Sequence, residues 1–168
     1  MADPMTADTV KNAARILSRL RQQTEDVRRL TAGLDEQGLG RRVFHDKWSL
    51  KELVAHLHRV QQVFEGRVDA MLKRDNPEIE PYEPEGDNLF ETMAARPAAA
   101  VLPAFFNDRE RLLRGLESLG PEAWLRTGTH PEFPGYGVLF QIEYMAHHEA
   151  HHIYQMFQRR AQLARGEE

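Results

Sequence analysis

Apolar residues recur at spacings of three and four along four stretches of the chain, which is the spacing of one face of an α-helix. The stretches run from about Thr6 to Leu34, from Ser49 to Arg74, from Pro97 to Leu119 and from Gly137 to Ala164. The sequence has no sustained alternation of apolar and polar residues and no Asn-Gly or Asp-Gly turn, so it predicts no sheet. Four amphipathic helices predict an all-α fold, a four-helix bundle, and we expect residues 1–168 to form one domain.

The apolar stripes identify the side chains that we expect to face the core. They are Val10, Ala13, Leu17, Leu20, Val27, Leu30 and Leu34 in the first helix, Leu57, Val60, Phe64, Val68 and Met71 in the second, Val101, Phe105, Leu112, Leu116 and Leu119 in the third, and Val138, Ile142, Met145 and Met156 in the fourth. Ser49 and Glu52 form an S-x-x-E capping box at the start of the second helix, and Trp48 and Leu53 stand at the positions of a hydrophobic staple. Pro103 predicts a kink in the third helix, because proline removes one helical hydrogen bond.

Two connections are long. The segment from Asp75 to Glu91 holds seven acidic residues, three prolines and no lysine or arginine. This composition favours a solvated acidic crossover between the second and third helices, and a lid over a site is the alternative. The connection from Gly120 to Tyr136 contains the aromatic turn His130-Pro131-Glu132-Phe133, which has no clear chemistry of its own.

Composition and charge exclude several classes of function. The chain carries 22 basic and 26 acidic residues, a net charge of −4, which argues against nucleic acid or an anionic membrane as a main partner. No apolar run approaches the length of a membrane span, and the first ten residues do not have the pattern of a signal peptide. The absence of cysteine excludes disulfides, thiolate ligands and a cysteine nucleophile. It also fits a reducing compartment, so we expect a cytoplasmic protein.

Four of the eight histidines lie together in the last helix, between positions 147 and 152. Histidines four residues apart share one face of a helix, which suits two imidazoles on one metal ion. Two such pairs exist. At about 100° per residue, His148 and His152 lie toward the apolar direction of the helix, whereas His147 and His151 lie on the opposite side. We therefore predict that His148 and His152 form the inward pair.

A catalytic zinc-type site usually has three protein ligands and one open position, so a third ligand is needed. The second helix offers His56 and His58, and its helical phase gives a slight preference to His56. The alternative is that these histidines merely border the core. Three imidazoles suit zinc, nickel, copper or iron, and we expect zinc or nickel first.

Glu149 lies within roughly 20° of the apolar direction of the last helix. A buried carboxylate needs a partner. Glu149 is therefore a candidate general base, an acceptor that orients a ligand histidine, or half of an ion pair. The ion-pair alternatives are Arg15, Arg19 and Arg109.

Two known kinds of metal site fit the sequence poorly. His148-Glu149-x-x-His152 matches the H-E-x-x-H string of zinc peptidases, but only 16 residues follow, and their only potential ligands are Glu167 and Glu168. A ferritin-like di-iron centre requires two Glu-x-x-His motifs, and only Glu149 with His152 forms one.

Three segments resemble the DinB-like superfamily of bacterial proteins. Residues 47–57 (KWSLKELVAHL) resemble the start of its second helix, residues 148–156 (HEAHHIYQM) its last-helix signature, and residues 119–133 the connection before that helix. The resemblance implies a four-helix bundle, usually a homodimer, with a divalent metal ion held by one histidine of the second helix and two of the last. On this chain these ligands are His56, His148 and His152. Tyr154 departs from the family pattern, and a phenol there is expected to narrow the cavity or supply a hydroxyl.

The same resemblance implies a class of reaction. Characterised members of the superfamily include thiol S-transferases that use bacillithiol, mycothiol or glutathione, and a mycothiol-dependent maleylpyruvate isomerase. It therefore implies a metal-dependent transferase that activates a small-molecule thiol for attack on an electrophile, which is reasonable because a bound cation deprotonates a coordinating thiol. The alternatives are a metal-binding, stress-associated protein without turnover and a metal-assisted hydrolase.

Overall fold

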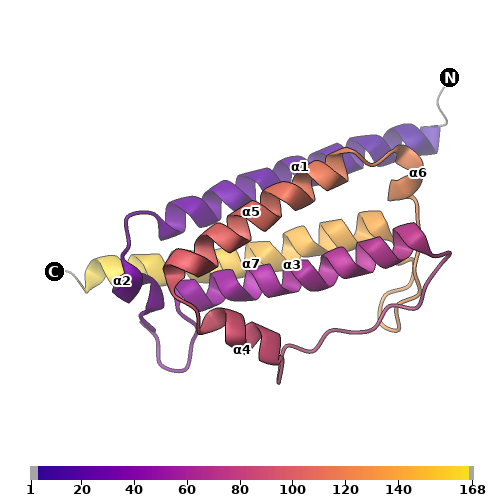
Figure 1. The fold of residues 1–168 in the computed structure, drawn as a ribbon. Coiled ribbons are helices and arrows are strands. Elements are labelled where there is room, and N and C mark those ends of the chain that lie inside the picture. Colours follow the sequence, from indigo (N-terminus) through magenta and orange to yellow (C-terminus); the bar gives the residue numbers. More distant parts are fainter. Residues whose placement is uncertain (1–3, 167–168) are drawn as a thin grey trace.

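A computed structural model describes residues 4–166 of the chain, and four long helices dominate it (Figure 1). The elements are α1 (Pro4–Thr31), α2 (Glu36–Gly40), α3 (Leu50–Lys73), α4 (Asn88–Ala94), α5 (Ala98–Glu117), α6 (Pro121–Trp124) and α7 (Val138–Arg165). Across the described residues there is no strand, and two isolated bridges join Glu78 to Thr129 and Thr127 to Gly137. The predicted all-α four-helix bundle is therefore confirmed. None of the described helices is both long and apolar enough to span a bilayer.

The order of packing around the bundle determines the path of the chain. α1 packs against α7 and α5, and α3 also packs against α7 and α5. α3 and α5 run in the same direction, so the chain must return along α3 before α5 can begin (Figure 1). Residues 74–97 make this return, and α4 forms within it.

The start of α3 follows from the predicted capping box. The backbone amide of Glu52 donates to the Ser49 hydroxyl at 3.2 Å, and the Glu52 carboxylate accepts from the Ser49 amide at 2.8 Å. The other predicted helix ends lie within a few residues of those observed. Pro103 is the sixth residue of α5, and the helix continues through it. The short helices α2, α4 and α6 were not predicted, because none is long enough to show an apolar period.

Most of the predicted core residues are buried, and Val10 is an exception. It is 46% exposed, whereas Thr9 is buried beside it. The buried face of α1 runs from Leu17 through Ala13 to Thr9 in steps of four, and Val10 stands one position away from that line.

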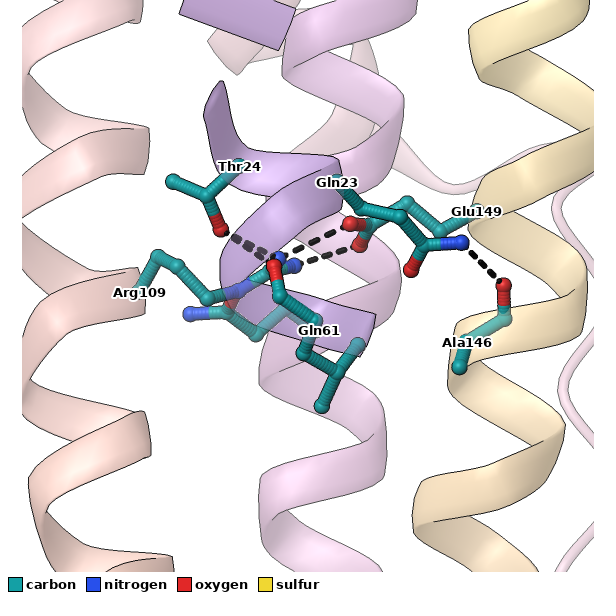
Figure 2. A network of polar contacts seen from close by, with 7 residues as sticks. Gln23, Thr24, Gln61, Arg109, Ala146 and Glu149 are labelled. Atoms are coloured by element: carbon teal, nitrogen blue, oxygen red, sulfur yellow. Dashed lines mark hydrogen bonds and ion pairs between the residues drawn. The ribbon is translucent and has the colours of Figure 1, made fainter. Parts of the chain in front are cut away.

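A polar layer crosses the middle of the bundle, where Arg109 of α5 contacts the other three long helices (Figure 2). Its guanidinium donates to Gln61 Oε1 of α3 at 2.7 Å, to Thr24 Oγ1 of α1 at 3.2 Å, and to both carboxylate oxygens of Glu149 of α7 at 2.9 and 2.5 Å. Gln23 of α1 donates to the carbonyl of Ala146 on α7 at 2.8 Å. The side chains of Arg109 and Glu149 are 0% and 2% exposed. This layer joins all four helices at one level.

We predict that Arg109→Ala lowers the free energy of unfolding by about 3–5 kcal/mol, because it leaves the Glu149 carboxylate charged, buried and unpaired. Urea denaturation measures the change. Arg114→Ala is the control, since Arg114 is exposed on the same helix and pairs with Glu110 one turn away. Its loss should be about 0.5 kcal/mol or less. If the ion pair carries the effect, Arg109→Met combined with Glu149→Leu costs less than Arg109→Ala alone, and an equal or larger cost would contradict this account.

Candidate metal centre

Three histidines from two neighbouring helices meet beside the polar layer. His56 lies on α3, two turns after its cap, and His148 and His152 lie one turn apart on α7. The Nε2 atom of His148 is 3.4 Å from Nε2 of His56 and 3.1 Å from Nε2 of His152. One ring nitrogen from each histidine lies within 4.8 Å of the other two. The structure thus brings together the three histidines that the sequence singled out.

Hydrogen bonding of His152 determines which of its nitrogens faces the group. Its Nδ1 atom lies 2.9 Å from Oε1 of Gln155. Because a side-chain carbonyl oxygen only accepts, Nδ1 carries the proton and Nε2 keeps its lone pair. The amide nitrogen of Gln155 in turn donates to Nε2 of His151 at 3.2 Å. Gln155 therefore orients His152 in the way that outer partners orient metal ligands.

Aromatic rings close one side of the group. The Trp48 ring lies 4.7 Å from the ring of His56 and 6.4 Å from that of His152, measured between centroids. Phe90 of α4 packs 5.1 Å from Trp48 and 5.8 Å from His56. His56 and His152 are consequently only 4% and 8% exposed.

Burial keeps the imidazoles neutral. Burial, together with smaller contributions from positive charge on His152 and His148, lowers the pKa of His56 to about 3. Burial also lowers the pKa of His148 to about 4, with a contribution from His152, and it lowers the pKa of His152. Near neutral pH the three rings are therefore uncharged, which is the form that binds metal ions.

The spacing of the Nε2 atoms fits a tetrahedral metal ion. Ligand nitrogens at 2.0–2.1 Å from zinc in tetrahedral geometry lie about 3.3 Å from one another. The two measured separations, 3.4 and 3.1 Å, are close to this value. The ring nitrogens of the third pair, His56 and His152, lie within 4.8 Å of one another. Three neutral nitrogens grouped in this way are a donor set that suits a divalent cation with one position left for another ligand.

A cavity of about 190 Å³ adjoins the histidines. Its walls come from α3, α7, the return segment before α4 and the loop before α7. The lining residues are His56, Val60, Phe64, Arg67, Pro81, Tyr82, Pro84, His130, Glu132, Phe133, Tyr136, Tyr144 and His148. His56 and His148 belong to both the cavity and the histidine group, so a molecule in the cavity reaches the group directly.

The other histidines and Tyr154 occupy different surroundings. His147 and His151 are exposed, as their helical phase predicted. His58, the second candidate of its helix, lies outside the group: it is 5% exposed, and its Nε2 lies 2.6 Å from a carboxylate oxygen of Asp108 on α5. Tyr154 is 61% exposed and does not line the cavity, which contradicts the role expected for its phenol.

Glu149 is half of an ion pair, one of the alternatives that the sequence left open. Both of its carboxylate oxygens accept from Arg109, the third of the arginines considered. Its negative charge nevertheless acts on His152, where it opposes the fall in pKa caused by burial.

Sequence reasoning assigned no role to Arg67, Tyr82, Tyr136 or Gln155. One signal was present, because Arg67 continues the face of α3 that carries His56, Val60 and Phe64 at spacings of four, four and three. The tyrosines come from loops, whose positions no periodicity predicts.

A helix bundle with three histidines converging between two of its helices defines a class of candidate metal proteins, and comparison with known proteins identifies the family. The sequence model of one protein family, the DinB superfamily, matches residues 19–156 of the chain. The chain belongs to the DinB superfamily.

Two relatives illustrate this membership. The uncharacterized protein YuaE of Bacillus subtilis (strain 168) is 28% identical over 143 residues, covering 74% of this chain and 84% of YuaE. The solved structure of YfiT from Bacillus subtilis superposes with a TM-score of 0.73 at 15% identity, covering 90% of this chain and 87% of YfiT. YfiT is described as a probable metal-dependent hydrolase with an unusual four-helix bundle topology. At this identity the likeness shows the shared fold.

The lowered histidine pKa values predict a pH-dependent stability of the protein stripped of metal by a chelator. An unfolded chain has histidine pKa values near 6.5, so below that pH it binds protons that the folded histidines do not. The free energy of unfolding should therefore fall as the pH falls from about 6.5 toward 4, by up to about 1.4 kcal/mol per pH unit for each such histidine. Urea denaturation between pH 7.5 and 5 measures the slope. His148→Gln should flatten it and the exposed His147→Gln should not, so equal slopes in the two variants would contradict the assignment.

Proposed function

We propose that the chain binds one divalent cation through His56, His148 and His152, and that the protein with this cation bound is a thiol S-transferase. The observation that carries the proposal is the convergence of three neutral imidazoles on one point in the wall of a cavity. A structural metal site is usually closed by four protein ligands, whereas a catalytic site keeps one position open. Zinc and nickel are the cations expected first.

The surroundings of the histidines favour a thiol as the activated group. A bound divalent cation supplies Lewis acidity, which favours the thiolate form of a thiol without a protein base. Among the described residues, the carboxylate next to the group on α7, Glu149, is held by Arg109 and is not free to take a proton. The chain has no cysteine, so the thiol arrives with the cosubstrate. The residues of the protein then orient the thiol and exclude water, through the Trp48 and Phe90 rings on one side and the cavity walls on the other.

A metal-dependent hydrolase is the second candidate, and the description of YfiT supports it. Hydrolysis requires a group that accepts a proton from the attacking water. Of the described residues that line the cavity, Glu132 is the one with a carboxylate. Glu132 is therefore the general base that this alternative requires.

Metal binding should depend on three histidines and not on their neighbours. We predict that His56→Ala, His148→Ala and His152→Ala each raise the zinc dissociation constant by about a hundredfold or more, because only two imidazoles remain. Isothermal titration of the metal-free protein measures the constant. The controls are His147→Ala and His151→Ala on the exposed side of α7. Each should change the zinc dissociation constant by less than about tenfold, which is the smallest change typical for loss of a residue that hydrogen-bonds a metal ligand.

His58→Ala provides a further control. It should leave zinc affinity unchanged while lowering the free energy of unfolding by about 0.5–1.5 kcal/mol, since it removes one hydrogen bond to Asp108, which keeps its ion pair with Arg111. Retention of zinc by the His148→Ala, His152→Ala double variant, with loss in the His147→Ala, His151→Ala double variant, would overturn the proposed site.

Activity assays separate the two candidate reactions. The zinc-loaded protein should accelerate conjugation of a thiol to 1-chloro-2,4-dinitrobenzene, in which a carbon–sulfur bond forms and chloride leaves, and His148→Ala should abolish the acceleration. Glu132→Gln should leave this rate unchanged. Zinc-dependent hydrolysis of 4-nitrophenyl acetate that Glu132→Gln removes, with no thiol conjugation, would instead support the hydrolase.

A further inference from the structure

Arg67 of α3 brings a half-buried positive charge to the cavity, and no carboxylate of the described chain pairs with it. One terminal nitrogen of its guanidinium donates to the backbone carbonyl of Glu80 at 2.7 Å. The other lies 3.4 Å from Gln141 Oε1 and 3.5 Å from the Tyr136 hydroxyl. All three partners are neutral acceptors. By contrast, nearby Arg59, one helical turn from the histidine group, is paired with Asp87 at 2.7 Å.

Arg67 and His56 lie on the same face of α3, which determines how Arg67 is placed relative to the histidine group. His56 and Arg67 are eleven residues apart, which is three helical turns and roughly 20° of rotation. The Phe64 ring is close both to His148 of the histidine group and to Arg67. Its centroid is 6.2 Å from that of His148 and 5.4 Å from Cζ of Arg67, so the guanidinium lies within the sum of these two distances from the imidazole.

We propose that Arg67 binds the carboxylate of a small ligand whose other end reaches His56, His148 and His152. This deepens the proposed function and rests on it. A guanidinium offers a planar fork of donors that matches a carboxylate, and such charge-assisted bonds are the strong ones. Both the positive group and the histidines border the same cavity, so one molecule contacts them together.

The other groups that line the cavity narrow the class of ligand. Burial, followed by the charge of Arg67, lowers the pKa of His130, so this ring is neutral near pH 7 and does not add a second positively charged side chain to the cavity. Glu132 contributes a negative charge at an exposed position. Arg67 is the one positively charged side chain among the described residues that line the cavity, and a single guanidinium matches the two oxygens of one carboxylate.

The walls and volume define the body of the ligand. Phe64, Phe133 and three tyrosines surround the space, so the part between the two ends is apolar. About 190 Å³ is below the roughly 300–1,000 Å³ of cavities for drug-sized ligands. The expected ligand is thus a small thiol with an apolar spacer and one carboxylate.

Binding of 6-mercaptohexanoate and of its amide to the zinc-loaded protein tests this proposal by isothermal titration. The two probes share the thiol and the spacer and differ in the carboxylate. The acid should bind the wild-type protein about ten- to a hundredfold more tightly than the amide, which corresponds to hydrogen bonds with a charged group. Arg67→Gln should remove this preference, and Arg67→Lys should keep part of it. Arg114→Gln, which removes a distant exposed charge, should keep all of it.

The outcomes distinguish the two levels of the proposal. Equal zinc-dependent binding of acid and amide by the wild-type protein overturns the role of Arg67 and leaves the thiol site standing. Binding of neither probe to the zinc-loaded protein overturns both. A preference for the acid that persists in Arg67→Gln also overturns the role of Arg67. Because the acid-to-amide ratio is measured first in the wild-type protein, the test stands even if Arg67→Gln loosens the loop at Glu80.

Discussion

The arrangement of the whole molecule depends on the contact of Arg109 with three other helices. Its guanidinium is bound by Glu149 of α7, Gln61 of α3 and Thr24 of α1 at the same level of the bundle. An apolar core tolerates changes of side chain when volume and pattern are kept, whereas a bidentate ion pair is satisfied in one geometry. The pair therefore fixes the rotation of α7 about its axis. Glu149 follows His148 directly and precedes His152 by three residues, so the same rotation turns both histidines toward α3.

The sequence predicted the parts of this structure that depend on local spacing. Helical period separated His148 and His152 from His147 and His151, and the capping box located the start of α3. The period preferred His56 to His58 only slightly, because it does not show the contact of His58 with Asp108, which lies 50 positions later in the chain. For Glu149 it predicted burial and left three arginines as partners, since the choice among them depends on how the helices pack. Tyr82 and Tyr136 reach the cavity from loops, and no local pattern encodes such a position.

The walls of the candidate centre are a consequence of the order of the helices. Because α3 and α5 are parallel neighbours, the chain has to cross the length of α3 between them (Figure 1). One part of this return supplies Pro81, Tyr82 and Pro84 to the cavity, and a later part, α4, places Phe90 against Trp48 and His56. A direct hairpin between antiparallel helices would supply neither.

Asp87 joins these two parts of the return segment to α3. Its carboxylate accepts from Arg59 at 2.7 Å and from the Tyr82 hydroxyl at 2.6 Å, and it caps α4 through the amides of Leu89 and Phe90. One half-buried side chain thus holds the cavity wall at Tyr82 and the aromatic cover at Phe90 in fixed relation to the helix that carries His56. The polar layer of Arg109 sets the directions of the histidines from inside the bundle, and Asp87 sets their surroundings from outside it. The segment that lines the cavity beside the histidines is therefore one whose length the parallel arrangement of α3 and α5 requires.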